Sequence, residues 1–373
     1  MRTRVAEMLD TEFPLLAFSH CRDVVAAVTN AGGFGVLGAV AHSPERLDSE
    51  LTWIDQQTAG KPYGVDLLLP PKYVGQERGG IDGDQVRELL PQEHQEFVSE
   101  LLIRYGITVS NDDQRRAQGR LNISPKGYEP LLDVAFGHRI RLIANALGPA
   151  PADLITRAHD HGVLVASLAG STQHARRHAE SGVDLIVAQG TEAGGHTGDV
   201  STMVLVPEVV DAVAPIPVLA AGGIARGRQI AAALALGAEG VWCGSVWLTT
   251  EEAETPTVVR DKFLAATSSD TVRSRSLTGK PARMLRTAWT DEWERSDNPD
   301  PLPMPLQTAL VGDAQLRINV AAAQPDSKAH ELATYFVGQV VGWMDKVRPA
   351  KAVVLDMIAE FIDVVELLKG VVA

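Results

Sequence analysis

Residues 184–198 read DLIVAQGTEAGGHTG, an apolar run followed by a glycine-rich turn that also holds an acid and one histidine. A short apolar run bounded by turn residues is typical of a buried strand, here 185–189. In parallel α/β proteins, ligands bind just beyond the carboxyl ends of the strands, where this turn lies. Gly194 and Gly195 permit a close backbone approach to a ligand, and His196 offers an imidazole that titrates near neutral pH. The alternative is a glycine-rich turn with a surface histidine.

The alternation of strand and helix continues on both sides of this turn, from near the start of the chain to about residue 250. Strand-like runs alternate with segments whose apolar residues recur at three- and four-residue intervals, as on the buried face of a helix. The predicted strands are 15–19, 35–38, 63–69, 141–146, 163–168, 185–189, 218–221 and 240–244. Eight such units predict a (β/α)8 TIM barrel. An open doubly wound sheet is the alternative, although no GxGxxG turn follows the first strand.

The barrel is expected to occupy residues 1–270, with one interruption and one addition. The segment from about 70 to 139 is polar and longer than a simple connection between strand and helix. We interpret it as an insertion after the third strand that forms a lid over the ligand; a poorly ordered insertion is the alternative. Residues 271–373 form a C-terminal extension, with helices over 328–346 and 350–369 that are expected to pack on the barrel.

Composition narrows the class of protein. The 373-residue chain has a formal net charge of −13, which argues against a nucleic-acid partner or an anionic membrane surface. Two cysteines exclude a disulfide framework and fit a reducing cytoplasm. The N-terminus has no apolar signal core, and no apolar run is long enough to span a bilayer, so we expect a cytoplasmic protein. HExxH and CxxC are absent, so no metal is expected, and GxSxG is absent too.

Two further glycine clusters end the seventh and eighth predicted strands, AAGGI at 220–224 and VWCGS at 241–245. In TIM barrels, the loops after these two strands commonly hold a phosphate through backbone N–H groups and the N-terminus of a helix. Because the chain is acidic overall, such backbone donors rather than a basic patch would have to bind the phosphate. The candidate phosphate ligands are Gly222, Gly223, Gly244 and Ser245. Two tight turns without a ligand are the alternative.

The first and third predicted strands also end in residues that suit a ligand site. The first strand ends in Ala17, Phe18 and Ser19, and His20 follows, either as a ligand contact or as a structural residue. Asp66 lies inside the apolar run GVDLLL, where an unpaired carboxylate is costly to bury. A polar group of a ligand would satisfy this carboxylate, and so would an internal hydrogen bond.

Taken together, these motifs resemble the nitronate monooxygenase family, also called 2-nitropropane dioxygenase-like proteins, which are FMN-dependent (β/α)8 barrels. The resemblance covers most of residues 10–290 and rests on AGGFGVLGA, GVDLLLP, ESGVDLIVAQGTEAGGHTG and AAGGIARGRQIAAALALGAEGVWCGS. Relatives usually carry a Gln/Ala-Pro-Met sequence after the first strand, where AFSHCRD stands here, and the compact members have a smaller insertion. Both differences lie at the substrate mouth and bear on the substrate more than on the cofactor.

The resemblance implies roles for individual residues. Gln189 and Gly194 would contact the flavin, and His196 would face the substrate as the catalytic base. Asp66 would lie near the isoalloxazine ring, at a position where relatives often carry Asn. The FMN phosphate would be held by Gly222, Gly223, Gly244 and Ser245. The expected cofactor site also includes Ala17, Phe18, Ser19 and Gly195.

The expected activity is FMN-dependent oxidation of an alkyl nitronate or nitroalkane with O2, with His196 removing the α-proton of a neutral nitroalkane. An NAD(P)H-dependent flavin reductase of enoyl thioesters or quinones shares the EAGGH element and is the first alternative. A flavin-free barrel isomerase or synthase that binds a sugar phosphate is the second, and a non-catalytic flavin-binding protein is the third. We expect a small-molecule substrate, no nucleic-acid or membrane partner, and leave a homodimer open.

Overall fold

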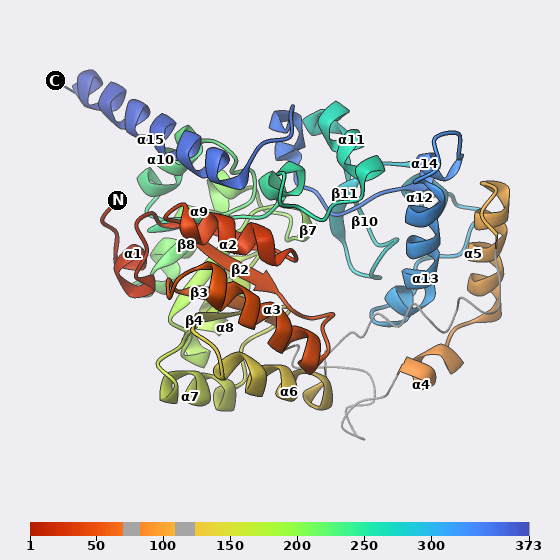
Figure 1. Ribbon diagram of the computed structural model, residues 1–373, viewed down its shortest axis with the longest axis horizontal. Coiled ribbons are helices and arrows are strands. Elements are labelled where there is room, and N and C mark those ends of the chain that lie inside the picture. Colours follow the sequence, from red (N-terminus) through yellow and green to blue (C-terminus); the bar gives the residue numbers. More distant parts are fainter. Residues whose placement is uncertain (70–82, 109–123, 373) are drawn as a thin grey trace.

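The computed structural model describes residues 1–69, 83–108 and 124–372 (Figure 1). Eight parallel strands close into a barrel in the order β1-β2-β3-β4-β5-β6-β8-β9, which confirms the predicted TIM barrel. The strands are β1 (Leu15–Ser19), β2 (Phe34–Gly38), β3 (Tyr63–Leu68), β4 (Ile140–Ala146), β5 (Leu164–Ala169), β6 (Leu185–Gln189), β8 (Val218–Ala221) and β9 (Gly240–Cys243). The open-sheet alternative is therefore wrong.

Helices surround the barrel and cover the outward side chains of its strands. They are α2 (Arg22–Asn30), α3 (Pro44–Gln57), α6 (Pro125–Phe136), α7 (Ala152–Asp160), α8 (Thr172–Ser181), α9 (Thr202–Val213) and α10 (Gly227–Ala235). The short helix α1 (Arg4–Leu9) precedes β1, and its Val5 and Leu9 pack with the side chains inside the barrel. Successive side chains of a strand point to opposite faces. In β3, Val65 and Leu67 accordingly pack outward in the core shared with the helices, which leaves Asp66 facing inward.

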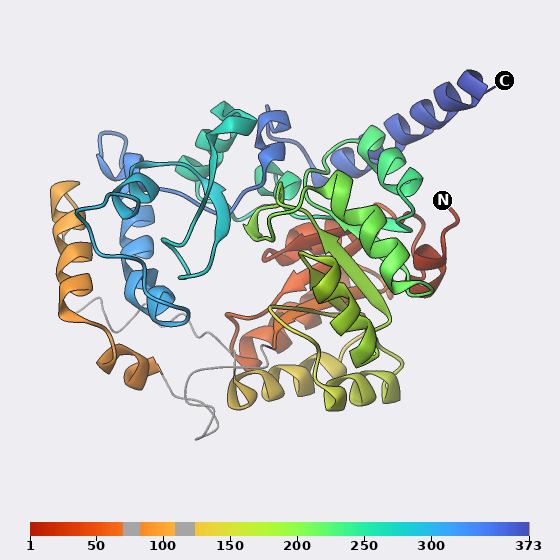
Figure 2. The same ribbon diagram turned by 180° about the vertical axis from the view of Figure 1, so that it is seen from behind.

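The C-terminal extension forms a second body beside the mouth of the barrel (Figures 1 and 2). Its antiparallel sheet, in the order β10-β11-β7, pairs two of its own strands with a strand that belongs to the glycine-rich turn. These strands are β10 (Thr271–Ser274), β11 (Ala282–Leu285) and β7 (Gly195–His196). Three helices lead from β9 to the extension: η3 (Ser245–Thr249), α11 (Thr257–Ala265) and η4 (Ser268–Asp270). The helices of the extension itself are α12 (Ala288–Trp293), α13 (Leu306–Ala321), α14 (Ala329–Leu332), η5 (Gln339–Trp343) and α15 (Ala350–Val372).

One predicted helix of the extension is wrong. Residues 328–346 were expected to form a single helix, but they form α14, an extended stretch over 333–338 and the 3-10 helix η5. Phe336 makes an antiparallel bridge with Met284, and the N–H of Gly338 donates to Ser245 Oγ at 2.8 Å. These contacts with distant segments outweigh the local helical pattern of the sequence.

The last part of the predicted insertion, α6, belongs to the barrel, where it packs on α3. The earlier described part, residues 83–108, packs against the C-terminal extension, away from the barrel (Figures 1 and 2). It contains α4 (Gly83–Glu88) and α5 (Gln92–Arg104). Phe97 of α5 meets Trp293 of α12 edge to face, with ring centroids 4.8 Å apart, and Leu101 lies fully buried in the same hydrophobic cluster. Insertion and extension thus share a core of their own. Residues 70–82 and 109–123, which the lid hypothesis also covers, lie outside the described residues.

The last helix, α15, returns to the barrel. Its first half packs on α10 and α2, and its far end projects from the body of the molecule (Figure 1). Val354 and Met357 are buried in this contact, and Glu360 forms ion pairs with Arg226 and Arg228. Among the helices that the structure describes, none combines the length and apolar character needed to cross a lipid bilayer.

Candidate active site

A cavity of about 1060 Å³ lies at the carboxyl ends of the barrel strands, bordered on its other side by the C-terminal extension. This volume is at the upper end of what small-molecule and cofactor sites have, about 300–1,000 Å³. Nearly all of the predicted site residues lie in the wall of this cavity. Those that line the cavity are Phe18, Ser19, Asp66, Gln189, Gly194, Gly195, His196, Gly222, Gly223, Gly244 and Ser245.

Ala17 is the exception among the predicted site residues. Its side chain is fully buried in the core between barrel and helices, whereas that of the next residue, Phe18, borders the cavity. The alternation of side chains along a strand explains this difference, because neighbouring residues of β1 face opposite sides of the sheet. Ala17 therefore supports the wall from behind and brings no side chain to the cavity.

The glycine-rich turn after β6 is held by an acid that the sequence analysis did not assign. The carboxylate of Glu192 accepts hydrogen bonds from the backbone N–H of Thr202 at 3.0 Å and from Thr202 Oγ1 at 2.8 Å. It thereby caps the first turn of α9, where a negative charge is favourable. At Gly190, an added Cβ would lie only 2.1 Å from Thr202 Oγ1, so this close packing requires glycine. The acid's position ahead of a helix start was the signal available in the sequence.

Gly194 and Gly195 are glycines for different reasons. A Cβ on Gly194 would lie 2.8 Å from the backbone nitrogen of Gly338, so this residue fits closely against the C-terminal extension. Gly195 has φ +78°, which L side chains rarely adopt, and a Cβ there would meet nothing within 4 Å. Gly194 thus joins the turn to the extension, and Gly195 leaves open space at the cavity.

His196 is positioned by the sheet that joins the turn to the extension. It pairs with Ala282 of β11, and its Nδ1 lies 3.3 Å from the carbonyl oxygen of Pro281. Because that carbonyl only accepts, Nδ1 carries the proton in the neutral ring and Nε2 keeps a lone pair. Desolvation lowers the pKa of His196 below its ordinary value of 6.5; the Pro281 hydrogen bond opposes this effect and Lys280 adds to it. At neutral pH the ring is therefore uncharged and able to accept a proton.

The ends of β8 and β9 offer backbone donors that suit a phosphate. Within the described ranges, the N–H groups of Gly223, Ile224, Gly244 and Ser245 donate to no protein acceptor. Gly222 and Gly223 have φ values of +93° and +72°, which expose the turn's backbone. Ser245 Oγ accepts from Gly338, so its own hydroxyl hydrogen stays available. Unpaired donors at adjacent strand ends are the usual chemistry of a phosphate site.

The N-terminus of α10, which was expected to add to this phosphate site, already has protein acceptors. Gln229 Oε1 accepts from the N–H groups of Ala225 at 2.8 Å and Arg226 at 3.0 Å. Glu360 Oε2 of α15 accepts from the N–H of Gly227 at 2.8 Å. A phosphate at this edge would therefore rely on the two loops and not on the helix end.

Asp66 faces the cavity without a partner. Its side chain is 7% exposed, and no hydrogen bond or ion pair of its carboxyl group is found among the described residues. The sequence left open an internal hydrogen bond as the partner of this buried carboxyl group. The described residues contain no such hydrogen bond. Desolvation by burial raises the pKa of Asp66 to about 8.

Several cavity residues were not predicted from the sequence or were left open. His20 borders the cavity. Desolvation by the surrounding protein lowers the pKa of His20, and the hydrogen bond to Gly38 opposes this effect. Its Nδ1 lies 3.0 Å from the Gly38 carbonyl oxygen. The C-terminal extension adds Lys280, Tyr335 and Phe336 to the wall. No local pattern indicates that residues so far along the chain return to the barrel mouth.

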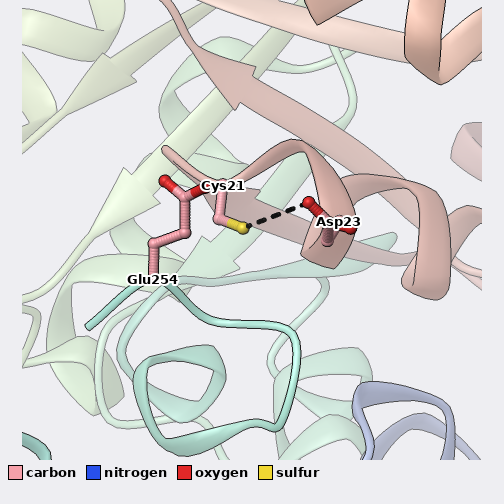
Figure 3. Close-up of side chains that lie close together, drawn as sticks. All are labelled: Cys21, Asp23 and Glu254. Carbon is pink, nitrogen blue, oxygen red and sulfur yellow. Dashed lines mark hydrogen bonds between the residues drawn. The ribbon is translucent and has the colours of Figure 1, made fainter. Parts of the chain in front are cut away.

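Cys21, Asp23 and Glu254 gather at one edge of the cavity region (Figure 3). One potential ligand atom from each lies within 4.8 Å of the others. The Cys21 thiol donates to the carbonyl oxygen of Glu252 at 2.9 Å and lies 4.0 Å from Asp23 Oδ2. Desolvation raises the pKa of this thiol, which keeps it protonated and disfavours metal ligation. The contacts among protein groups account for this cluster.

Comparison with known proteins agrees with this geometry. The model of the nitronate monooxygenase family matches residues 7–360. The chain belongs to the nitronate monooxygenase family. It is 77% identical to a Mycobacterium tuberculosis protein named as a monooxygenase, over the full length of both chains. The chain is thus an oxidoreductase, and its family membership supports flavin-dependent chemistry.

Two solved structures cover almost the whole chain. Nitroalkane oxidase from Streptomyces ansochromogenes is 26% identical, with a TM-score of 0.79 and coverage of 98% of this chain and 99% of that one. FabK from Thermotoga maritima is 28% identical, with a TM-score of 0.72 and 99% coverage of both chains. The likeness to these two structures therefore extends over both the barrel and the C-terminal extension.

Proposed function

We propose that this member of the nitronate monooxygenase family uses FMN to oxidise alkyl nitronates or nitroalkanes with O2, and that His196 is its base. The observation that carries the proposal is the juxtaposition in one cavity of unpaired phosphate donors and an imidazole with a free Nε2. The likeness to the Streptomyces nitroalkane oxidase over nearly the whole chain supports the same reaction class.

The residues of the cavity fit FMN as the bound group. Gly222, Gly223, Gly244 and Ser245 would hold its phosphate through backbone N–H groups and one hydroxyl. The ring system would lie among Phe18, Ser19, Asp66, Gln189, Gly194 and Gly195 at the barrel mouth. When bound, the flavin supplies electron transfer from substrate to O2, which protein side chains do not provide.

His196 has the properties of a general base for a neutral nitroalkane. Its Nδ1–H is fixed by Pro281, which orients the ring and leaves Nε2 to take the α-proton. Because its pKa is lowered, the uncharged form predominates above pH 6.5. Turnover of a nitroalkane should therefore be constant above that pH and fall below it, as the ring becomes protonated. A nitronate has already lost this proton, so its oxidation does not need the base.

Replacing His196 with Asn tests the proposal. Asn keeps a donor in the place of Nδ1–H but has no group in the place of Nε2. We expect kcat/KM for a nitroalkane to fall by about 10²-fold or more, the usual contribution of a general base. FMN content, measured from the absorbance spectrum, should stay at the wild-type level, and the corresponding nitronate should be affected much less. Wild-type turnover of the nitroalkane by this variant would exclude His196 as the base.

The flavin reductase alternative has one observation in its favour, the full-length likeness to FabK. Anaerobic mixing with NADPH or NADH separates the two functions. Rapid bleaching of the flavin absorbance would favour the reductase, and an unchanged spectrum that bleaches on addition of a nitronate would favour the proposed oxidation. A colourless protein that FMN does not reconstitute would exclude both.

A further inference from the structure

The surroundings of Asp66 explain why its carboxyl group has no partner in the protein. In the barrel, Asp66 lies in register with Gly38 of β2 and with Ala144 of β4. These three positions face the barrel interior together, because in-register residues of parallel strands point the same way. Neither glycine nor alanine has a polar side-chain atom. The two in-register positions beside Asp66 therefore offer its carboxyl group no polar side-chain atom.

Other titratable groups of the cavity do not supply a fixed partner. His20, at the end of β1, packs over Gly38, where an added Cβ would lie 2.6 Å from its Nδ1. That Nδ1 is already bound to the Gly38 carbonyl. His178 of α8 binds the Leu168 carbonyl, and His196 of β7 binds that of Pro281. Within the described residues, none of these rings forms an ion pair with Asp66.

A carboxylate that is buried and unpaired is strongly unfavourable, and such groups bind a proton instead. We propose that Asp66 is an uncharged carboxylic acid in the resting enzyme and donates a hydrogen bond to the ring system of the bound flavin. This inference rests on the proposed FMN site. To that site it adds a role for Asp66, whose carboxylic acid donates a proton in a hydrogen bond and can also lose this proton.

The proposal makes flavin binding depend on pH in a defined direction. The pKa of Asp66 is raised to about 8, so the carboxylic acid predominates at neutral pH and the carboxylate above pH 8. Ionisation removes the donor and puts a negative charge beside a ring that becomes more electron-rich when reduced. Both binding and the midpoint potential of the flavin should therefore decrease as the pH rises through 8.

The test compares wild type with Asp66→Asn and Asp66→Leu, using FMN as the ligand. Asn has nearly the same shape and donates at every pH, while Leu fills the space without a donor. The dissociation constant is measured from the quenching of FMN fluorescence between pH 6 and pH 9, where free FMN serves as the control. We expect wild-type affinity to fall towards tenfold per pH unit above pH 8, the limit for one lost proton. D66N should stay constant there, and D66L should bind FMN more weakly at neutral pH without this dependence.

The outcomes separate this inference from the proposed function. If wild type binds FMN with the same pH profile as D66N, Asp66 does not act through its proton, although the flavin site stands. A decrease shared by wild type and both variants would assign the titration to another group and also overturn the inference. If wild type does not bind FMN at any pH, the proposed function fails first.

Discussion

Replacing Glu360 with Gln should loosen the attachment of α15 to the barrel. The carboxylate of Glu360 accepts from Arg226 Nε at 3.0 Å, from Arg228 Nε at 2.6 Å and from the N–H of Gly227 at 2.8 Å. Gln keeps the shape of the side chain but loses its charge. It also turns one of the two acceptor oxygens into an NH2 group, which faces the donors of two guanidinium groups.

The expected loss of stability follows from these three contacts. A hydrogen bond to a charged group contributes about 1.5–3 kcal/mol. The side chains of Arg226 and Arg228 are 40% and 60% exposed, so their ion pairs with Glu360 add only about 0–1 kcal/mol each. The contact with the helix N-terminus at Gly227 is better shielded, since the Glu360 side chain is only 17% exposed. Together these contributions give a loss of about 2 kcal/mol in the free energy of unfolding at pH 7.

The loss should depend on pH. Desolvation would raise the pKa of Glu360, but the hydrogen bonds from Arg226, Arg228 and Gly227 outweigh it and lower the pKa below its ordinary 4.5. A carboxylate whose folded pKa is lowered stabilises the protein above the unfolded pKa and loses this effect as the pH falls through the folded value. The difference between wild type and E360Q should thus be full at pH 7 and shrink below pH 4.5.

Urea unfolding at pH 7 and at pH 4 measures this difference, and proteolysis at the α15 junction reports on local loosening. Glu366→Gln is the matched control, because Glu366 lies on the same helix and pairs only with the exposed Lys369 among the described residues. That control should leave the unfolding curve nearly unchanged. If E360Q unfolds like wild type at pH 7, or loses the same stability at both pH values, the contact of Glu360 with α10 does not hold α15.

Two further substitutions test the phosphate turn and the second core. Gly223→Ala places a Cβ at φ +72° and should weaken FMN binding about tenfold, or 1.4 kcal/mol, by equilibrium dialysis. Gly162→Ala, at φ +69° and remote from the cavity, should leave that affinity unchanged, and an equal loss in both would contradict a ligand role for the turn. Leu101→Ala should destabilise the protein by about 2–5 kcal/mol in urea unfolding, because Leu101 lies in the core of insertion and extension. Leu89→Ala is the control for Leu101→Ala, because Leu89 is exposed. If both substitutions change the free energy of unfolding by a similarly small amount, insertion and extension do not share a core.

The barrel could be predicted from the sequence because its units are local. Each strand is a short apolar run and each helix a segment with a regular apolar spacing, so their positions follow without knowledge of distant contacts. The bounds of β1, β6 and β8 agree with the prediction residue by residue. The alternating direction of side chains along β1 also indicates which residues can face a ligand, and the prediction did not use it. Three consecutive residues were assigned to the ligand, but neighbouring side chains of a strand point to opposite faces, and Ala17 points away from the cavity. Ser19, the last residue of β1, still borders the cavity.

The rest of the site depends on pairings that leave no local pattern. His196 is fixed by β11, and the paired Ala282 lies 86 residues further along the chain. Residues 333–338 carry enough apolar side chains to suggest a helix, yet they extend along the cavity because Gly338 must reach Ser245. Glu192 and Glu360 each cap a helix that starts elsewhere in the sequence. Such contacts are determined by tertiary packing, which periodicity and spacing do not report.

The glycine pair of the EAGGH element shows why barrel and extension form one structural unit at the cavity. Gly338 lies so close to the turn that its own Cβ would approach the carbonyl oxygen of Glu192 to 2.6 Å. The next N–H, that of Gln339, donates to this same oxygen at 2.9 Å, and Gly338 donates to Ser245. A side chain at Gly194 would separate these segments even in the absence of a ligand. Gly194 therefore serves the joint between turn and extension, whereas a Cβ at Gly195 would meet nothing within 4 Å, which leaves open space at the cavity.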